Sequence, residues 1–226
     1  MSLAPDIVKT ITRISPELVK SAGRFQAAIL ADVNGRRGTM HGRIQPLSPT
    51  MQVAGPAFTV EVRAGDNLLI HAAIAMAQPG DVIVVDGKAD QTCALIGEIM
   101  SSQAMQRGIA GFVLDGSVRD CDALRSMGFP VFAIGGNPCG PTKKTPGRIN
   151  WPISCGGTAV NPGDLVVADA DGVTIVERER VADLIPLAEK KVADETKRLA
   201  GIRAGQPSTP AWLAQALIDA EITSES

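Results

Sequence analysis

The chain has 226 residues, of which 45% are hydrophobic and 20% charged, a composition typical of a globular protein with a substantial core. Its 22 Lys and Arg residues are balanced by 24 Asp and Glu residues, so the formal net charge is -2. This balance argues against nucleic acid as a partner, because phosphate contacts need clustered basic residues. Aromatic residues make up only 3% of the chain and Tyr is absent, which also disfavours a stacking platform for single strands.

No segment approaches ~18 consecutive apolar residues, so we expect no membrane span. The first residues lack the basic and then apolar pattern of a secretory signal. The four cysteines form no CxxC pair and lie apart from both histidines, which disfavours a zinc site. We therefore expect a cytoplasmic protein with reduced, mostly buried thiols.

Helical and strand signals alternate along the first half of the chain. Ser15 and Pro16 form a capping residue and a first-turn proline, and Asp66 is positioned to cap a second helix. Gly and Pro clusters separate these segments. The pattern predicts helices from residue 16 and over 25–33 and 67–77, a loop over 40–56, and strands over 58–62 and 81–86.

The second half continues the alternation and then becomes helical. It predicts helices over 97–107 and 122–127, strands over 111–115 and 130–134, a long loop over 135–151, a hairpin over 165–177, a charged helix over 178–204 that is bent or broken near Pro186, and a short helix around 212–217. This order indicates an α/β domain over residues 1–180 with some parallel strands, followed by a helical extension over 181–226.

The segment from Asp115 to Asp120 carries the clearest chemical signal. A buried strand is predicted to end at Asp115 and to turn through Gly116, which places Arg119 and Asp120 beyond its carboxyl end. Such positions favour ligand chemistry in α/β sheets. A guanidinium suits a carboxylate or keto oxygen, and a carboxylate suits Mg²⁺ or Mn²⁺. The alternative interpretation is a structural ion pair in a turn.

Three further features have both a functional and a structural interpretation. Gly97 is placed at a helix start, where free N–H groups attract anions, although it could be a simple packing glycine. His71 is a possible base, but a histidine on an apolar helix face is more often a core residue. Lys143 and Lys144 could attract an anionic substrate or could form a solvated loop face.

Several short motifs are spread over residues 25 to 177. They are the segments 53–60, 65–68 with His71, 79–82, 97–98, 115–120, 128–131 and 162–164. Together these motifs resemble the regulator of ribonuclease activity A (RraA) superfamily, and within it the chain looks most similar to 4-hydroxy-4-methyl-2-oxoglutarate / 4-carboxy-4-hydroxy-2-oxoadipate aldolases. The resemblance implies a swivelling β/β/α sandwich that assembles as a homotrimer or homohexamer with sites at subunit interfaces.

The resemblance also implies roles for individual residues. Backbone groups of the helix start would bind the substrate carboxylate, Arg119 would contact the 2-oxo acid, and Asp120 would bind the divalent metal, Mg²⁺ or Mn²⁺. Glu195 resembles a glutamate that a neighbouring subunit contributes to support metal-bound water. The residues of the helix start are Gly97, Glu98, Ile99 and Met100.

One position departs from the family pattern. Active aldolases usually carry an acidic residue three positions after the metal aspartate, where this chain has Ala123. Asp122 is one residue earlier, a rotation of about 100° on a helix, so it cannot simply replace that acid. The main hypothesis is a divalent-metal-dependent lyase, a class II pyruvate aldolase and/or oxaloacetate decarboxylase, that acts on 4-hydroxy-2-oxo diacids through a pyruvate enolate. The alternatives are a protein-binding regulator of ribonuclease E and a structural oligomer with a vestigial metal site.

Overall fold

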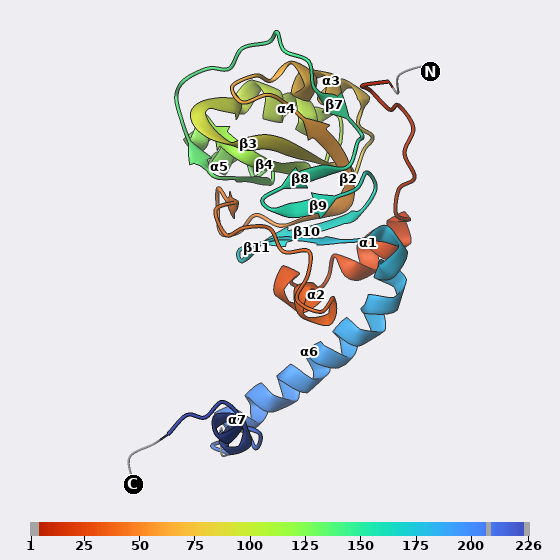
Figure 1. The fold of residues 1–226 in the computed structure, drawn as a ribbon. Coiled ribbons are helices and arrows are strands. Elements are labelled where there is room, and N and C mark those ends of the chain that lie inside the picture. Colours follow the sequence, from red (N-terminus) through yellow and green to blue (C-terminus); the bar gives the residue numbers. More distant parts are fainter. Residues whose placement is uncertain (1–4, 207–208, 224–226) are drawn as a thin grey trace. The chain divides into compact units, whose positions relative to one another are not determined.

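The computed structural model describes residues 5–206 and 209–223 (Figure 1). Residues 1–4 of the expected α/β domain, and residues 207–208 and 224–226 of the expected helical extension, lie outside the described residues. Packing divides the chain into two compact units, Met1–Ala188 and Glu189–Ser226. This division falls about two helical turns beyond residue 180, because the start of the long helix packs on the first unit.

The first unit is built on one mixed sheet. Its strands are β1 (Gln45–Pro46), β2 (Val53–Glu61), β3 (Val82–Ile96), β4 (Gly111–Val118), β5 (Val131–Ala133), β6 (Gly135–Gly136), β7 (Arg148–Ile149), β10 (Leu165–Asp169) and β11 (Gly172–Val176). They follow the order β1-β5-β4-β3-β2-β10-β11, with β6 beside β4 and β7 beside β2. The β2–β3, β3–β4 and β4–β5 pairs are parallel, and β10 is antiparallel to both neighbours. The predicted α/β class and the hairpin are confirmed.

Helices of the first unit pack on the sheet, as does a small hairpin. The hairpin consists of β8 (Ile153–Cys155) and β9 (Thr158–Val160). The helices of the first unit are α1 (Pro16–Ala22), α2 (Ala27–Val33), α3 (Leu68–Met76), α4 (Glu98–Gln106), α5 (Cys121–Met127) and the start of α6 (Val181–Arg203), whereas α7 (Leu213–Asp219) belongs to the second unit. Helices α3 and α4 contact the central strands, whereas α2 contacts β10 and β11 (Figure 1). No helix among the described residues has the length and apolar character needed to cross a membrane.

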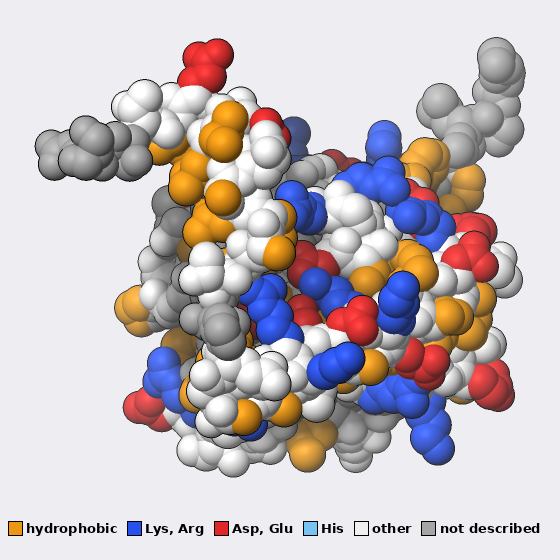
Figure 2. All heavy atoms as spheres, turned by 90° about the horizontal axis from the view of Figure 1, so that it is seen from below, with side chains coloured by type: hydrophobic (Ala, Val, Ile, Leu, Met, Phe, Trp, Pro, Cys, Tyr) orange, Lys and Arg blue, Asp and Glu red, His pale blue; other side chains and the backbone are white. Residues whose placement is uncertain are grey.

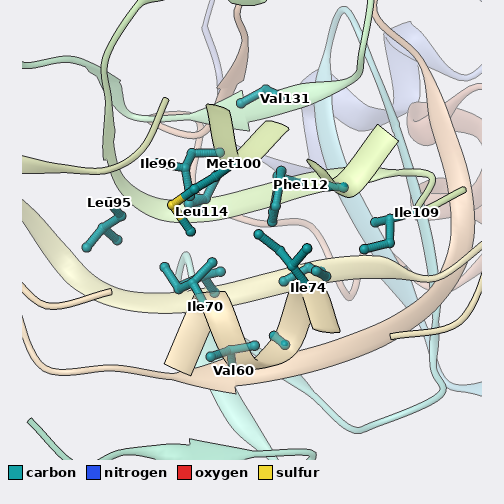
Figure 3. Close-up of a cluster of buried hydrophobic side chains, with 14 of the residues drawn as sticks. Val60, Ile70, Ile74, Leu95, Ile96, Met100, Ile109, Phe112, Leu114 and Val131 are labelled. Carbon is teal, nitrogen blue, oxygen red and sulfur yellow. The ribbon is translucent and has the colours of Figure 1, made fainter. Parts of the chain in front are cut away.

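The central strands are buried on both faces, which explains their continuous apolar sequences. Ile83 and Val85 face the cluster beneath α3 and α4, whereas Val84 faces the cluster beneath the β8–β9 hairpin. Figure 3 shows Ile70 and Ile74 of α3 within the first cluster. Since α3 and α4 pack this way on β3 and β4, their first turns lie near the carboxyl ends of those strands.

The predicted turn at Gly116 is wrong, because β4 continues to Val118. A Cβ on Gly116 would lie 2.7 Å from Leu95 Cδ1, so this glycine permits close approach of β3 within the sheet. The predicted loops also proved too long. β2 begins at Val53 because its first half pairs with distant β10, and β7 lies within the expected loop. Such long-range pairing leaves little local signal.

Of the bend or break predicted near Pro186, the break is wrong, since α6 is a single helix that continues through this proline. Proline lacks the N–H that would bond to the preceding turn. Val181, Leu184 and Ala188 are nevertheless buried on one face of this helix, in the cluster that includes α1 and α2. Burial of this face offsets the lost hydrogen bond near the helix start.

Candidate active site

Two chain segments leave the sheet together at the carboxyl ends of β3 and β4. Ile96 is paired with Val118 at the last position of the parallel register. The next residues of the two strands therefore emerge side by side, as expected at such an edge. The backbone N–H of Arg119 donates a hydrogen bond to Ile96 O at 3.0 Å, which extends the contact beyond the strands.

The predicted pair Arg119 and Asp120 lies at this edge. The Asp120 carboxylate accepts a hydrogen bond from the backbone N–H of Glu98 at 3.1 Å. Its Oδ2 lies 3.7 Å from Arg119 Nε, and the two side chains are 46% (Arg119) and 43% (Asp120) exposed. Asp120 has a left-handed backbone with φ 58°, which is uncommon for residues other than glycine and often marks a functional position. Both charged groups remain accessible to a ligand.

Gly97 makes this approach possible. A Cβ at this position would lie 2.4 Å from Asp120 Oδ2 and 2.9 Å from Arg119 Cγ. Gly140 borders the guanidinium from another segment, where a Cβ would lie 3.2 Å from Arg119 Nη1. The glycine predicted at the start of α4 therefore lies directly against the predicted charged pair.

A pocket of about 280 Å³ joins these groups, and all of its lining residues belong to the first unit. It lies between the start of α3, the start of α4 and the loop that precedes β7. The lining residues are Asn67, His71, Ala94, Leu95, Ile96, Gly97, Ile99, Met100, Arg119, Asp120, Gly140, Pro141 and Lys143. The structure thus brings Gly97, Ile99 and Met100 together with Arg119 and Asp120.

The start of α4 offers backbone donors to this pocket. The first N–H groups of an α-helix have no partner within the helix. That of Glu98 donates to Asp120, whereas those of Ile99 and Met100 have no acceptor within the helix. These two groups and the positive end of the helix dipole suit a carboxylate. Among the four residues predicted to bind the substrate carboxylate through their backbone, Ile99 and Met100 are therefore the ones with suitable N–H groups.

Asp66 fixes the loop that borders the pocket, a role that its position before a helix did not reveal. Its buried carboxylate accepts hydrogen bonds from Leu68 N, Thr142 Oγ1, Lys144 N and Thr145 N at 2.9, 2.7, 2.7 and 3.1 Å. Burial raises the pKa of Asp66, but these four bonds outweigh it and bring the pKa well below its ordinary value. The charged carboxylate thereby holds residues 142–145 against α3.

The structure places His71 on the wall of the pocket. Burial, and to a smaller extent the positive charge of Lys143, lowers the pKa of His71. The imidazole is therefore neutral near pH 7. Asn67, one helical turn earlier, also lines the pocket; it belongs to the motif 65–68, but the sequence analysis assigns its side chain no role.

Two acidic residues named from the sequence lie elsewhere. The Asp122 side chain is fully exposed and forms an ion pair of 2.8 Å with Arg125. It does not line the pocket, in line with its rotation of about 100° from position 123. Glu195 lies on α6 in the second unit, where it pairs with Lys191 at 3.0 Å. Its part in the site stays a prediction, since it was expected to come from a neighbouring subunit.

The donor set fits a hydrated hard cation better than zinc. Among the described residues, no three His, Cys, Asp or Glu side chains form a group that could hold a metal ion. Asp120 is the single carboxylate on the pocket wall. Mg²⁺ commonly retains several waters and binds through one or two carboxylates, whereas structural zinc takes four protein ligands.

Comparisons with known proteins identify the family of this chain. The family model "RraA-like: Aldolase/RraA" matches residues 15–175, so the chain belongs to the RraA-like family. It is 46% identical over 155 residues to a protein of Halalkalibacterium halodurans named "Putative 4-hydroxy-4-methyl-2-oxoglutarate aldolase", covering 69% of this chain and 74% of that protein.

Two solved structures share the fold. Streptomyces coelicolor RraAS2, described as an unusual member of the RNase ES inhibitor RraA family, gives a TM-score of 0.75 at 28% identity, over 84% of this chain and 99% of that one. The RNA-processing inhibitor RraA from "Thermus thermophilis" gives a TM-score of 0.62 at 26% identity, over 67% of this chain and 92% of that one. The family therefore includes proteins named as aldolases and proteins named as inhibitors of RNA processing.

Proposed function

We propose that this chain is a metal-dependent carbon–carbon lyase that releases pyruvate from 4-hydroxy-2-oxo diacids or from oxaloacetate. The observation that carries the proposal is the shared pocket, which combines free helix N–H groups, a guanidinium and an accessible carboxylate. The aldolase name of the Halalkalibacterium relative supports this substrate class.

The residues of the pocket suit both reactions. The substrate's C1 carboxylate would bind the N–H groups of Ile99 and Met100, and its keto oxygen would face Arg119. When the C3–C4 bond breaks, its electron pair enters the pyruvyl half and places negative charge on the keto oxygen. The Arg119 guanidinium stabilises that charge where it develops. In aldol cleavage the C4 hydroxyl proton passes to water and the other product is a carbonyl compound, whereas in decarboxylation the other product is CO₂. In both reactions C3 of the enolate then takes up a proton from water to give pyruvate.

Asp120 would hold the divalent metal, Mg²⁺ or Mn²⁺. When bound, such an ion supplies Lewis-acid polarisation of the substrate oxygens. The hydrogen bond from Glu98 N keeps the Asp120 carboxylate at the pocket wall. Arg119 Nε, 3.7 Å from Asp120 Oδ2, places a positive charge beside this carboxylate.

A coupled pyruvate assay tests the proposal directly. Wild-type protein should release pyruvate from oxaloacetate or from 4-hydroxy-4-methyl-2-oxoglutarate, and EDTA should abolish this activity. Asp120→Asn should lose metal-stimulated turnover, by roughly 100-fold or more, because the amide is a poor ligand for a hard cation. Asparagine tolerates the left-handed backbone of Asp120, so the fold should persist.

Asp122→Asn is the matched control. It removes the same charge two positions along the chain, from an exposed side chain that is not on the pocket wall. This variant should keep full activity. Wild-type protein that releases no pyruvate from either substrate with Mg²⁺ or Mn²⁺ would exclude the lyase.

One observation favours the non-catalytic alternative, a protein-binding regulator of ribonuclease E. Ala123, on α5 beside the charged pair, offers no acid where the aldolases usually have one. The similarity to the RNA-processing inhibitor from Thermus supports the same interpretation. A ribonuclease inhibition assay with purified protein separates the two functions, because the lyase hypothesis expects no effect on RNA cleavage.

A further inference from the structure

The α3 wall of the pocket carries two polar side chains for which the proposed chemistry has so far no role. Asn67 immediately precedes α3 and His71 lies one turn further on, and both line the pocket with Arg119 and Asp120. Residues four apart on a helix lie on the same side. The backbone N–H of His71 donates to Asn67 O at 3.2 Å, which fixes this spacing.

Each of these side chains has a polar atom without a partner. Asn67 Oδ1 and His71 Nε2 are both shielded from solvent and have no hydrogen bond among the described residues. Asn67 is only 3% exposed. Its Nδ2 donates to Leu95 O at 2.8 Å and to Met100 Sδ at 3.3 Å, so its orientation is fixed and Oδ1 is the unsatisfied atom.

Unsatisfied buried polar atoms are rare in native proteins because each costs about 1–3 kcal/mol. Two of them on one wall of a pocket indicate a ligand that completes their hydrogen bonds. The amide oxygen of Asn67 can only accept a hydrogen bond, and the neutral imidazole of His71 has one donor and one acceptor nitrogen. Such a pair suits a hydroxyl group better than a second carboxylate.

We propose that Asn67 and His71 form the subsite for the C4 hydroxyl of a 4-hydroxy-2-oxo diacid, which makes them specificity-determining residues for aldol cleavage. This inference rests on the proposed lyase function. Once α4 and Arg119 hold the pyruvyl half, C4 must face another wall, and α3 provides one. Lys143, exposed at the rim beside His71, supplies a positive charge for the distal carboxylate. Oxaloacetate and pyruvate have no C4 hydroxyl and do not need this pair.

The test compares two substrates with His71→Phe, which keeps a ring but removes both nitrogens. The kcat/KM for 4-hydroxy-4-methyl-2-oxoglutarate should fall about 10- to 100-fold, the effect of one lost hydrogen bond to a buried group. Decarboxylation of oxaloacetate and inhibition by pyruvate should change less than about twofold. His71→Gln should restore part of the aldolase activity, because its amide can reach a similar position. His71→Leu is smaller and serves the same purpose if the Phe variant does not fold.

His41→Phe is the matched control, since His41 is the other histidine of the chain and does not line the pocket. It should leave both activities unchanged. An equal loss on both substrates, or no loss on either, would overturn the subsite while leaving the lyase intact. Wild-type protein that is inactive on both substrates would instead overturn the proposed function and the subsite with it.

Discussion

At the scale of single residues, Gly97 determines whether Arg119 and Asp120 can share one pocket. Its backbone lies in the extended region, with φ -153°, so conformation alone does not require glycine. The requirement comes from space, because an added Cβ would overlap the Asp120 carboxylate. Gly97 therefore belongs to the binding site although it contributes no side chain.

Gly97→Ala should accordingly impair the site more than the fold. The added methyl group would displace the Asp120 carboxylate and Arg119, and we expect pyruvate release to fall by roughly 100-fold, since a displacement of about 1 Å can have that effect. Metal-stimulated turnover and thermal unfolding should both be measured. Gly42→Ala is the control, because nothing lies within 4 Å of a Cβ at that position. Full activity of Gly97→Ala would show that the Asp120 carboxylate need not remain where it is.

Sequence identified the charged pair but not the opposite wall. The register that pairs Ile96 with Val118 joins two predicted segments at one sheet edge, as the strand order of an α/β fold allows. Asn67 and His71 come from a helix that precedes β3, and their approach depends on how α3 packs. A lone histidine gives no sign of its surroundings, so the sequence favours a structural role for His71.

At the scale of elements, Asp66 ties the loop before β7 to the start of α3. The bonds join residues that are 76 to 79 positions apart in the chain. The loop in turn carries Gly140, Pro141 and Lys143 along the rim of the pocket. A buried carboxylate thus controls the shape of the pocket without lining it.

Asp66→Asn should lower the free energy of unfolding at pH 7 by about 1–3 kcal/mol, because an amide oxygen cannot accept all four bonds equally. The pKa of Asp66 is lowered in the folded state, so its contribution is complete above the unfolded value of about 3.9. It is lost as pH falls through the folded pKa. Urea unfolding should therefore show a constant difference from wild type between pH 7 and pH 5, which shrinks below about pH 4.

Asp171→Asn is the control for this experiment. Asp171 lies exposed in the turn of the β10–β11 hairpin, so its replacement should change stability little at any of these pH values. A difference between wild type and Asp66→Asn that grew as the pH fell would contradict the assignment of a charged, hydrogen-bonded Asp66.

Strand lengths show where sequence reasoning about elements reached its limit. The apolar residues of β3 and β4 predicted strands over 81–86 and 111–115, and these parts are confirmed. The extension of β3 to Ile96 passes through Lys88 and Ala89, which have positive φ without being glycine. Asp86 and Gly87 form a local turn signal directly before it, but the pairing with β4 continues across several register shifts and a local signal cannot reveal that continuation.

At the scale of the whole molecule, charge is distributed without a dominant sign. Figure 2 shows Lys and Arg side chains interspersed with Asp and Glu side chains on the face that it presents. This agrees with the small net charge of -2. The proposed anionic substrate would therefore be attracted by the charges of the pocket alone. The positive charge that the pocket offers comes from Arg119 and Lys143 rather than from a broad surface.

The second unit exposes several large apolar side chains. Its exposed large hydrophobic residues include Leu199, Ile202, Trp212, Ile218 and Ile222, of which Trp212 is 63% exposed. Exposed apolar residues of this kind often mark an interface between proteins. The family resemblance predicts that this unit contacts another copy of the chain and contributes Glu195 to that copy's site.

Mixing two inactive variants tests whether a site is shared between subunits. Asp120→Asn should inactivate the pocket of its own chain, and Glu195→Gln should inactivate the site to which it contributes. If each site combines Asp120 of one chain with Glu195 of a neighbour, random assembly of equal amounts leaves both residues intact in about a quarter of the sites. Co-expressed variants should then recover about a quarter of wild-type activity.

If Asp120 and Glu195 instead served the same site from a single chain, every site in the mixture would carry one defect. No activity would then return, whatever the size of the oligomer. The whole population of co-expressed oligomers should be assayed, and its subunit ratio measured beforehand, because selecting only mixed assemblies would raise the expected fraction of intact sites above a quarter. Full activity of Glu195→Gln alone would remove this residue from the site, because the metal-supporting role requires its carboxylate.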